Sequence, residues 1–198
     1  MAVEIDTVQG QSNVNLPPWD VTAIETDTRP APLPQPDSRR LLEGVKVLEL
    51  CRVIAGPTIG RILAEYGADV LKVTGRNQAD VPFFQVDVNM GKHTTALDLK
   101  REDDRATFES LLAEADVILD GYRPGAIEKL GYGSSKFAEV AKARGKGLVY
   151  VNENCFGYQG EWSHRAGWQQ IADCVSDPFR LAICSFYYFL STTLMAGL

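Results

Sequence analysis

Apolar residues in the middle of the chain follow two alternating patterns. Short runs rich in Val, Ile and Leu, such as 45–50, have the composition of buried strands. Between them, apolar residues recur every three or four positions, as in the stripe over 59–66 that follows Pro57, a residue suited to a first helical turn. The pattern predicts strands at 45–50, 70–73, 95–99, 116–119 and 148–151, and helices at 57–66, 102–115 and 134–143.

This alternation predicts an α/β fold. Strands separated by helices of this length need crossover connections, so the sheet is expected to be open, mostly parallel and Rossmann-like, with flanking helices. Ligands of such sheets bind beyond the carboxyl ends of the strands. The loops expected at that edge are 51–57, 74–77, 120–125 and 152–158.

The two ends of the chain depart from the alternating pattern. Residues 1–43 hold six of the ten prolines and seven acidic against three basic residues. We therefore interpret 1–40 as an extended, acidic, Pro-rich arm, 41–177 as the α/β domain, and 178–198 as an apolar segment of uncertain origin. The last eighteen residues carry no charge. They fit a membrane tail anchor, a buried helix, or an aberrant end produced by truncation, splicing or gene misprediction.

Composition narrows the class of protein. With 45% apolar residues, 23% charged residues and a net charge of −6, the chain is typical of a soluble globular domain and atypical of a nucleic-acid binder. The four cysteines form no CxxC pair, and neither they nor the two histidines have a metal-ligand spacing. The first residues lack the apolar run of a signal peptide, so we expect a cytoplasmic protein, with mitochondria and peroxisomes left open.

The familiar nucleotide-binding and hydrolase signatures are missing. Neither GxGxxG nor GxxxxGK[ST] follows a predicted strand, and the sequence contains no GxSxG. The residues alone therefore indicate an open α/β sheet with a ligand at its loop edge, and no particular chemistry.

A longer series of motifs resembles one family. The segments 42–50, 52–57 and 63–73 resemble the opening of the class III CoA-transferases, the CaiB/BaiF family. The likeness covers about residues 41–176 and continues in order through 89–92, 97–100, 115–118, 122–125, 130–132 and 156–160. It implies a chain that binds coenzyme A, takes a CoA thioester and a carboxylic acid as substrates, and forms a homodimer in its full-length relatives.

The resemblance also implies where coenzyme A binds. Its phosphates need cations and helix N-termini, and its adenine needs apolar walls. Val53 and Ala55 would line the adenosine and pantetheine path. The remaining expected contacts are Arg76, Leu97, Lys100, Tyr122 and Lys129.

Several positions depart from the family pattern. Thr74 replaces a usual glutamate, His93 a common arginine and Gly121 an expected asparagine. In the transferases an aspartate forms an aspartyl-CoA intermediate, and the family places that residue beyond the stretch around 167–172. No catalytic residue is therefore assigned, and the chain by itself is expected to be inactive. Trp168 stands where the racemase branch would have a histidine, which favours transferase ancestry. Two alternatives stay open: a non-catalytic CoA-binding or interaction module, with or without a tail anchor, and a racemase-type relative.

Overall fold

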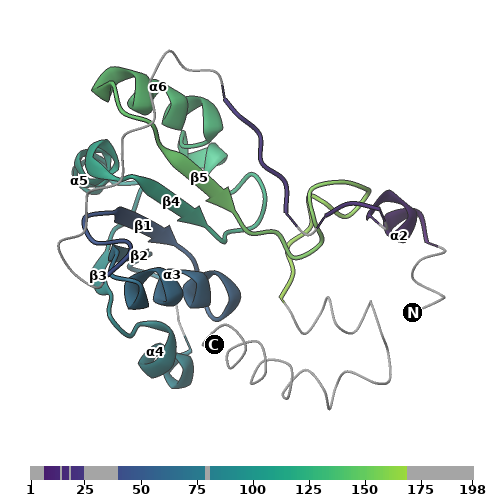
Figure 1. Ribbon diagram of the computed structural model, residues 1–198, viewed down its shortest axis with the longest axis horizontal. Coiled ribbons are helices and arrows are strands. Elements are labelled where there is room, and N and C mark those ends of the chain that lie inside the picture. The colour runs from purple at the N-terminus through teal and green to yellow at the C-terminus, as the bar shows by residue number, and fades with distance from the viewer. Residues whose placement is uncertain (1–6, 14, 18, 25–39, 79–80, 169–198) are drawn as a thin grey trace. The chain divides into compact units, whose positions relative to one another are not determined.

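The computed structural model describes residues 7–13, 15–17, 19–24, 40–78 and 81–168 (Figure 1). The chain divides into two compact units. One combines residues up to Thr22 with those from Asn154 onward, and the other runs from Ala23 to Glu153. The expected proline-rich run at 30–36 and the apolar segment 178–198 lie outside the described residues.

The larger unit is built on a parallel sheet. Its strands have the order β3-β2-β1-β4-β5, and all four neighbouring pairs are parallel, as the alternating pattern predicted. The chain adds strands on one side of β1 and then returns to add the others on its opposite side. The strands are β1 (Lys46–Leu50), β2 (Asp69–Thr74), β3 (His93–Ala96), β4 (Val117–Asp120) and β5 (Val149–Asn152).

Alternate residues of the strands pack against different helices. Leu48 and Leu50 of β1 belong to a core with Phe108 and Leu112 of α5 and Phe137 of α6. On the opposite face, Val45, Val47, Ala68 and Val70 pack with Leu63 and Ala64 of α3. The helices of this unit are α3 (Ala55–Glu65), α4 (Pro82–Val88), α5 (Glu102–Glu114), α6 (Ser134–Arg144) and the 3₁₀ turn η1 (Glu128–Leu130).

The structure differs from the sequence prediction at several places. Pro57 lies in the first turn of α3, as expected, whereas β3 lies at 93–96 instead of 95–99. Helix α4 was not predicted, because it is only seven residues long, Phe83 and Val86 are exposed, and Val88 is its one buried residue. Within the region interpreted as an extended arm, Val8–Asn13 form the short helix α2. No helix of the described residues is long and apolar enough to cross a membrane.

Candidate functional site

The sheet order places a topological switch point at the carboxyl ends of β1 and β4. These two strands are neighbours, and the connections that leave them run to opposite sides of the sheet. This topological switch point is the usual ligand site of open α/β sheets. Cys51 and Gly121 follow the two strands directly, and Glu153 follows β5. The predicted loop edge is therefore the candidate site.

The loop between β1 and α3 contains a strained residue. Val53 is buried and has a φ of +65°, the only positive φ among the described residues other than glycine. A β-branched residue rarely adopts this conformation, and such strain concentrates at ligand-binding loops. Ala55, the second expected contact in this loop, begins α3 and is exposed. The positions inferred for the adenosine and pantetheine path thus lie at the switch point.

Cys51 is close to both the start of α3 and the end of β4. A side chain added at Gly56 would lie 2.5 Å from the Cys51 Sγ atom, which leaves no room for one, and a side chain at Gly121 would make a tight contact of 3.0 Å with the same atom. Burial raises the pKa of the Cys51 thiol well above its usual range, and the negative charges of Glu49, Asp120 and Glu153 add to the effect. The neutral thiol is a packing group rather than a nucleophile.

Arg76 is held in place at the end of β2 by a carboxylate of α5. Its Nε and Nη2 atoms donate to the two oxygens of Asp104 at 3.0 Å and 3.1 Å. The backbone N–H of Asp98 donates to the same carboxylate at 2.8 Å, and that of Lys100 donates to Asp98 at 3.1 Å. The Asp98 N–H and the Arg76 guanidinium lower the pKa of Asp104. The expected contacts Arg76 and Lys100 are therefore joined through one network.

Tyr122 is oriented from both of its ends. Its hydroxyl donates to Gln78 Oε1 at 3.3 Å, and its backbone N–H donates to Asp120 Oδ1 at 2.9 Å. The other oxygen of Asp120 accepts the Tyr150 hydroxyl at 2.8 Å. Burial raises the pKa of Asp120 despite these bonds, and it also raises that of Tyr150. Asp120 thus shapes the turn that directs Tyr122 toward the β2–α4 loop.

The other two expected contacts are less closely tied to these groups. The Leu97 side chain lies in the core and is only 7% exposed, while its N–H bonds the Thr74 carbonyl at 2.9 Å. Only a small part of this side chain is open to a ligand. Lys129 is exposed in η1, beyond the turn that carries Tyr122.

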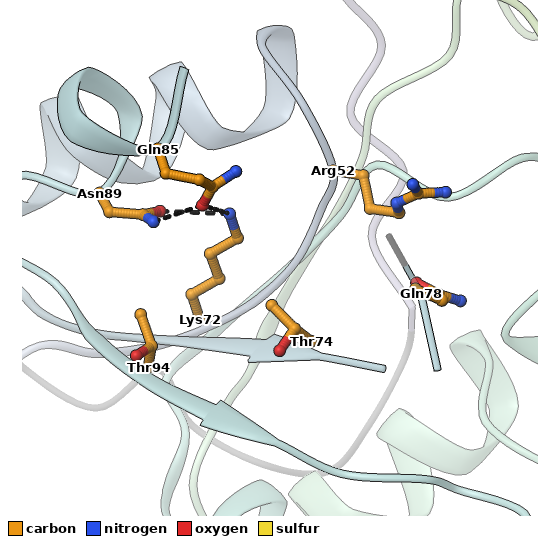
Figure 2. Close-up of a pocket in the computed structure, with 7 residues that line it drawn as sticks. All are labelled: Arg52, Lys72, Thr74, Gln78, Gln85, Asn89 and Thr94. Carbon is orange, nitrogen blue, oxygen red and sulfur yellow. Dashed lines mark hydrogen bonds between the residues drawn. The ribbon is translucent and has the colours of Figure 1, made fainter. Parts of the chain in front are cut away.

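Sequence reasoning missed a polar pocket of about 270 Å³ on the α3 and α4 side of the sheet (Figure 2). Within it, the buried Lys72 amine donates to Gln85 Oε1 at 3.1 Å and to Asn89 Oδ1 at 3.2 Å. The signal was a lysine inside a strand, at a position whose neighbours of the same parity, such as Val70, are buried. The described residues that line the pocket are Arg52, Lys72, Thr74, Gln78, Gln85, Asn89 and Thr94.

A buried ion pair lies next to this pocket. Lys92 Nζ donates to Glu49 Oε2 at 2.5 Å and to the Pro57 carbonyl at 2.7 Å, and both charged side chains are fully buried. Burial raises the pKa of Glu49 and lowers that of Lys92, while each partner opposes the shift of the other. The pair ties β1 and the segment before β3 to the first turn of α3. Among the described residues, no group of His, Cys, Asp and Glu could hold a metal ion.

Comparisons with known proteins identify the family. The model of CoA-transferase family III matches residues 42–181, and the chain belongs to this family. It is 41% identical over 170 residues to an acetyl-coenzyme A transferase, nodX, of Hypoxylon pulicicidum. This match covers 83% of the chain and 29% of the Hypoxylon protein. The chain is 32% identical over 157 residues to the succinyl-CoA:glutarate CoA-transferase of Homo sapiens, covering 72% and 35%.

Solved structures agree on the fold. A CaiB/BaiF family protein from Brucella suis matches with a TM-score of 0.61 at 24% identity. The match covers 81% of this chain and 50% of the Brucella suis chain. A hypothetical protein from Mycobacterium tuberculosis has a TM-score of 0.57 at 30% identity, covering 65% and 36%. The first three curated relatives are matched over 26% to 33% of their own length, so this chain spans about a third of such a protein.

Proposed function

We propose that this chain supplies the coenzyme A-binding part of a transferase that moves CoA between carboxylic acids. The observation that carries the proposal is the position of Arg76, the Lys100 segment and Tyr122. These groups come from three different loops, yet hydrogen bonds connect the first two through Asp104 and attach the third to the β2–α4 loop. A phosphorylated adenosine needs this combination of cations and an aromatic surface.

The Arg76–Asp104 pair fits a phosphate-binding role. Two of the guanidinium N–H groups are used by Asp104, and the side chain is still 53% exposed. A guanidinium has five N–H donors, so a ligand phosphate can accept from the others without breaking the pair. Asp104 then acts as a positioning residue that fixes the plane of the guanidinium.

The proposed reaction proceeds through an aspartyl-CoA intermediate. The aspartate carboxylate attacks the carbonyl carbon of the donor thioester, and the CoA thiolate leaves as a mixed anhydride forms. The thiolate then attacks the aspartyl carbonyl of the anhydride, which releases the donor acid and leaves an aspartyl-CoA thioester. The acceptor carboxylate repeats these two steps in reverse order and departs as the new CoA thioester.

The buried acids of the described core do not suit the attacking role. Glu49 is paired with Lys92, and Asp120 accepts hydrogen bonds from Tyr122 and Tyr150. We therefore propose that the aspartate comes from another part of the complete enzyme and that this chain alone binds CoA without turnover.

Calorimetric titration of the chain with coenzyme A tests the binding proposal. Lys100→Glu should weaken binding about tenfold, because a carboxylate replaces a cation beside the ligand phosphates. The matched control is Lys142→Glu, which makes the same charge change on helix α6, outside the proposed site, and should alter binding less than about twofold.

A second titration uses 3′-dephospho-CoA in place of coenzyme A. The unchanged chain should bind 3′-dephospho-CoA more weakly than coenzyme A. Lys100→Glu should reduce the affinity for 3′-dephospho-CoA by a smaller factor than the affinity for coenzyme A. Absence of binding by both ligands, or equal losses in the Lys100 and Lys142 variants, would refute the proposed site.

A further inference from the structure

The short helix α2 lies in the smaller unit, before the part of the chain that the family model matches. It spans Val8–Asn13, and the matched region begins at residue 42. Thr7 Oγ1 accepts the Gly10 N–H at 3.0 Å and caps the first turn. A helix of six residues is not stable alone in water, so contacts outside the helix must hold it.

Those contacts are made mainly by one carboxamide. Gln9 Nε2 donates to the carbonyl of Phe156 at 3.2 Å and to that of Gln159 at 2.9 Å. Gln9 Oε1 accepts the N–H of Trp162 at 2.9 Å. Both donors and the acceptor of a single side chain are therefore used by the backbone of 156–162, more than 140 residues away in the sequence.

Two glycines provide the space for this contact. Gly157 and Gly160 have φ angles of +75° and +87°, which favour glycine. A side chain at Gly160 would lie 2.8 Å from Gln9 Cδ, and one at Gly157 would lie 3.0 Å from Asn13 Oδ1. The loop therefore needs glycine at both positions to turn and also to admit the two amides of α2.

The contact extends past the helix and is supported by the loop itself. The hydroxyl of Tyr158 donates to the Pro17 carbonyl at 3.2 Å. Within the loop, the rings of Phe156 and Trp162 meet edge to face at 5.6 Å, and the Arg165 guanidinium lies 4.8 Å from the Trp162 ring centre. The backbone groups that bond Gln9 are thus presented by an ordered loop.

We propose that the surface formed by residues 156–162 is a docking site for the chain's own N-terminal segment, residues 7–17, and that the Gln9 carboxamide is the group it recognises. The segment orders the loop that carries the family-like motif 156–160, although it lies outside the matched region. This role is independent of coenzyme A binding.

Hydrogen exchange of the full chain, followed amide by amide, tests this proposal. Gln9→Leu removes all three side-chain hydrogen bonds and keeps a good helix former. The Trp162 amide should then exchange at least about tenfold faster, because its acceptor is gone. The matched control is Gln11→Leu, the same substitution at an exposed position of the same helix, with little expected change.

The remaining outcomes would each overturn the proposal. Unchanged exchange at Trp162 would show that Gln9 does not hold the loop. Equal effects of the two leucine variants would show a general loss of helix. Loss of protection in β1 and β4 as well would show that the segment supports the whole fold instead of docking on one loop.

Discussion

At the scale of single residues, the most constrained position in α3 is Gly60. A side chain there would overlap the carboxylate of Glu49 and lie 3.1 Å from Lys92 Nζ. The buried ion pair therefore occupies the place of a helix side chain. Since both charges are fully buried, neither can move into water to make room.

Gly60→Ala should destabilise the protein although alanine is the better helix former. Helix propensity alone predicts a gain of about 1 kcal/mol, whereas crowding in a packed core costs roughly 1–3 kcal/mol and here also displaces a buried charge. The measurement is the free energy of unfolding in urea. Ala106→Gly, at an exposed position of α5, calibrates the propensity term and should cost about 1 kcal/mol. A stabilised Gly60→Ala protein would contradict the packing argument.

Val53 offers a second test at this scale. Replacing a buried valine by glycine normally costs about 3 kcal/mol from lost burial and gained chain entropy. At Val53 the change also relieves a positive φ, worth roughly 1–2 kcal/mol. Val53→Gly should therefore cost clearly less than Val70→Gly in β2, where the valine is fully buried in a strand. Equal losses in urea unfolding would mean that Val53 stores no strain.

Some of these residue features could not be predicted from the sequence. Glu49 and Lys72 each stand inside a strand run, where the alternation of residues suggests burial. The sequence does not show which distant side chains bind these two charged groups. Lys92 lies 43 residues after Glu49 in the sequence, and only the sheet order brings it to that carboxylate. Likewise, Arg76 was expected near a phosphate, and its bidentate pair with Asp104 depends on how two loops meet.

At the scale of elements, the first turn of α5 joins two loops of the candidate site. The Asp104 carboxylate accepts hydrogen bonds from Arg76 in the β2–α4 loop and from the Asp98 N–H in the β3–α5 loop. A carboxylate in a first helical turn is also favoured by the helix dipole. This one side chain therefore couples helix position to loop position.

This coupling should depend on pH. Because the folded-state pKa of Asp104 lies below its ordinary value of 3.8, its stabilising effect is fully present above that value. The effect is lost as the pH falls through the lower, folded-state pKa. Urea midpoints should therefore show the unchanged protein more stable than Asp104→Asn at neutral pH, with the gap closing in acid.

Asp103→Asn, an exposed neighbour in the same helical turn, is the control for this experiment. It should shift the neutral-pH midpoint much less than Asp104→Asn does. A gap between the unchanged protein and Asp104→Asn that stays constant into acid would contradict the proposed coupling.

The elements with a buried apolar face were predictable, whereas those without one were not. The stripe after Pro57 and the strand runs led to α3, β1, β2 and β4 within two residues. Helix α4 exposes Phe83 and Val86 and buries only Val88, and α2 is held by hydrogen bonds to a remote loop, so neither leaves a periodic signal. The strand order also depends on packing between distant segments and was not predicted.

At the scale of the whole molecule, the two compact units differ in how they are stabilised. The buried residues among those described all lie between Val45 and Ala141, in the larger unit. The described residues of the smaller unit, 7–13, 15–17, 19–22 and 154–168, include none. Hydrogen bonds such as those of Gln9, with one aromatic cluster, hold the smaller unit together.

Native-state hydrogen exchange in low urea should separate the two units. Amides of β1 and β4 should exchange only through global unfolding, at rates that rise with urea, because they cover the main core. Amides of 154–168 should exchange by local opening that exposes little apolar surface, at rates nearly independent of urea. A single common urea dependence for both regions would contradict this division.

The central place of β1 in the sheet has a consequence for synthesis of the chain. Its partner on one side, β4, follows it by about 70 residues, as the pairing of Leu50 with Asp120 shows. At about 5–20 residues per second, translation takes several seconds or more to cover that distance. During that time β2 can pair with β1, but the opposite edge of β1 has no strand to receive. The nascent protein therefore passes through a period in which one edge of its central strand is unpaired and open to wrong pairing with another strand.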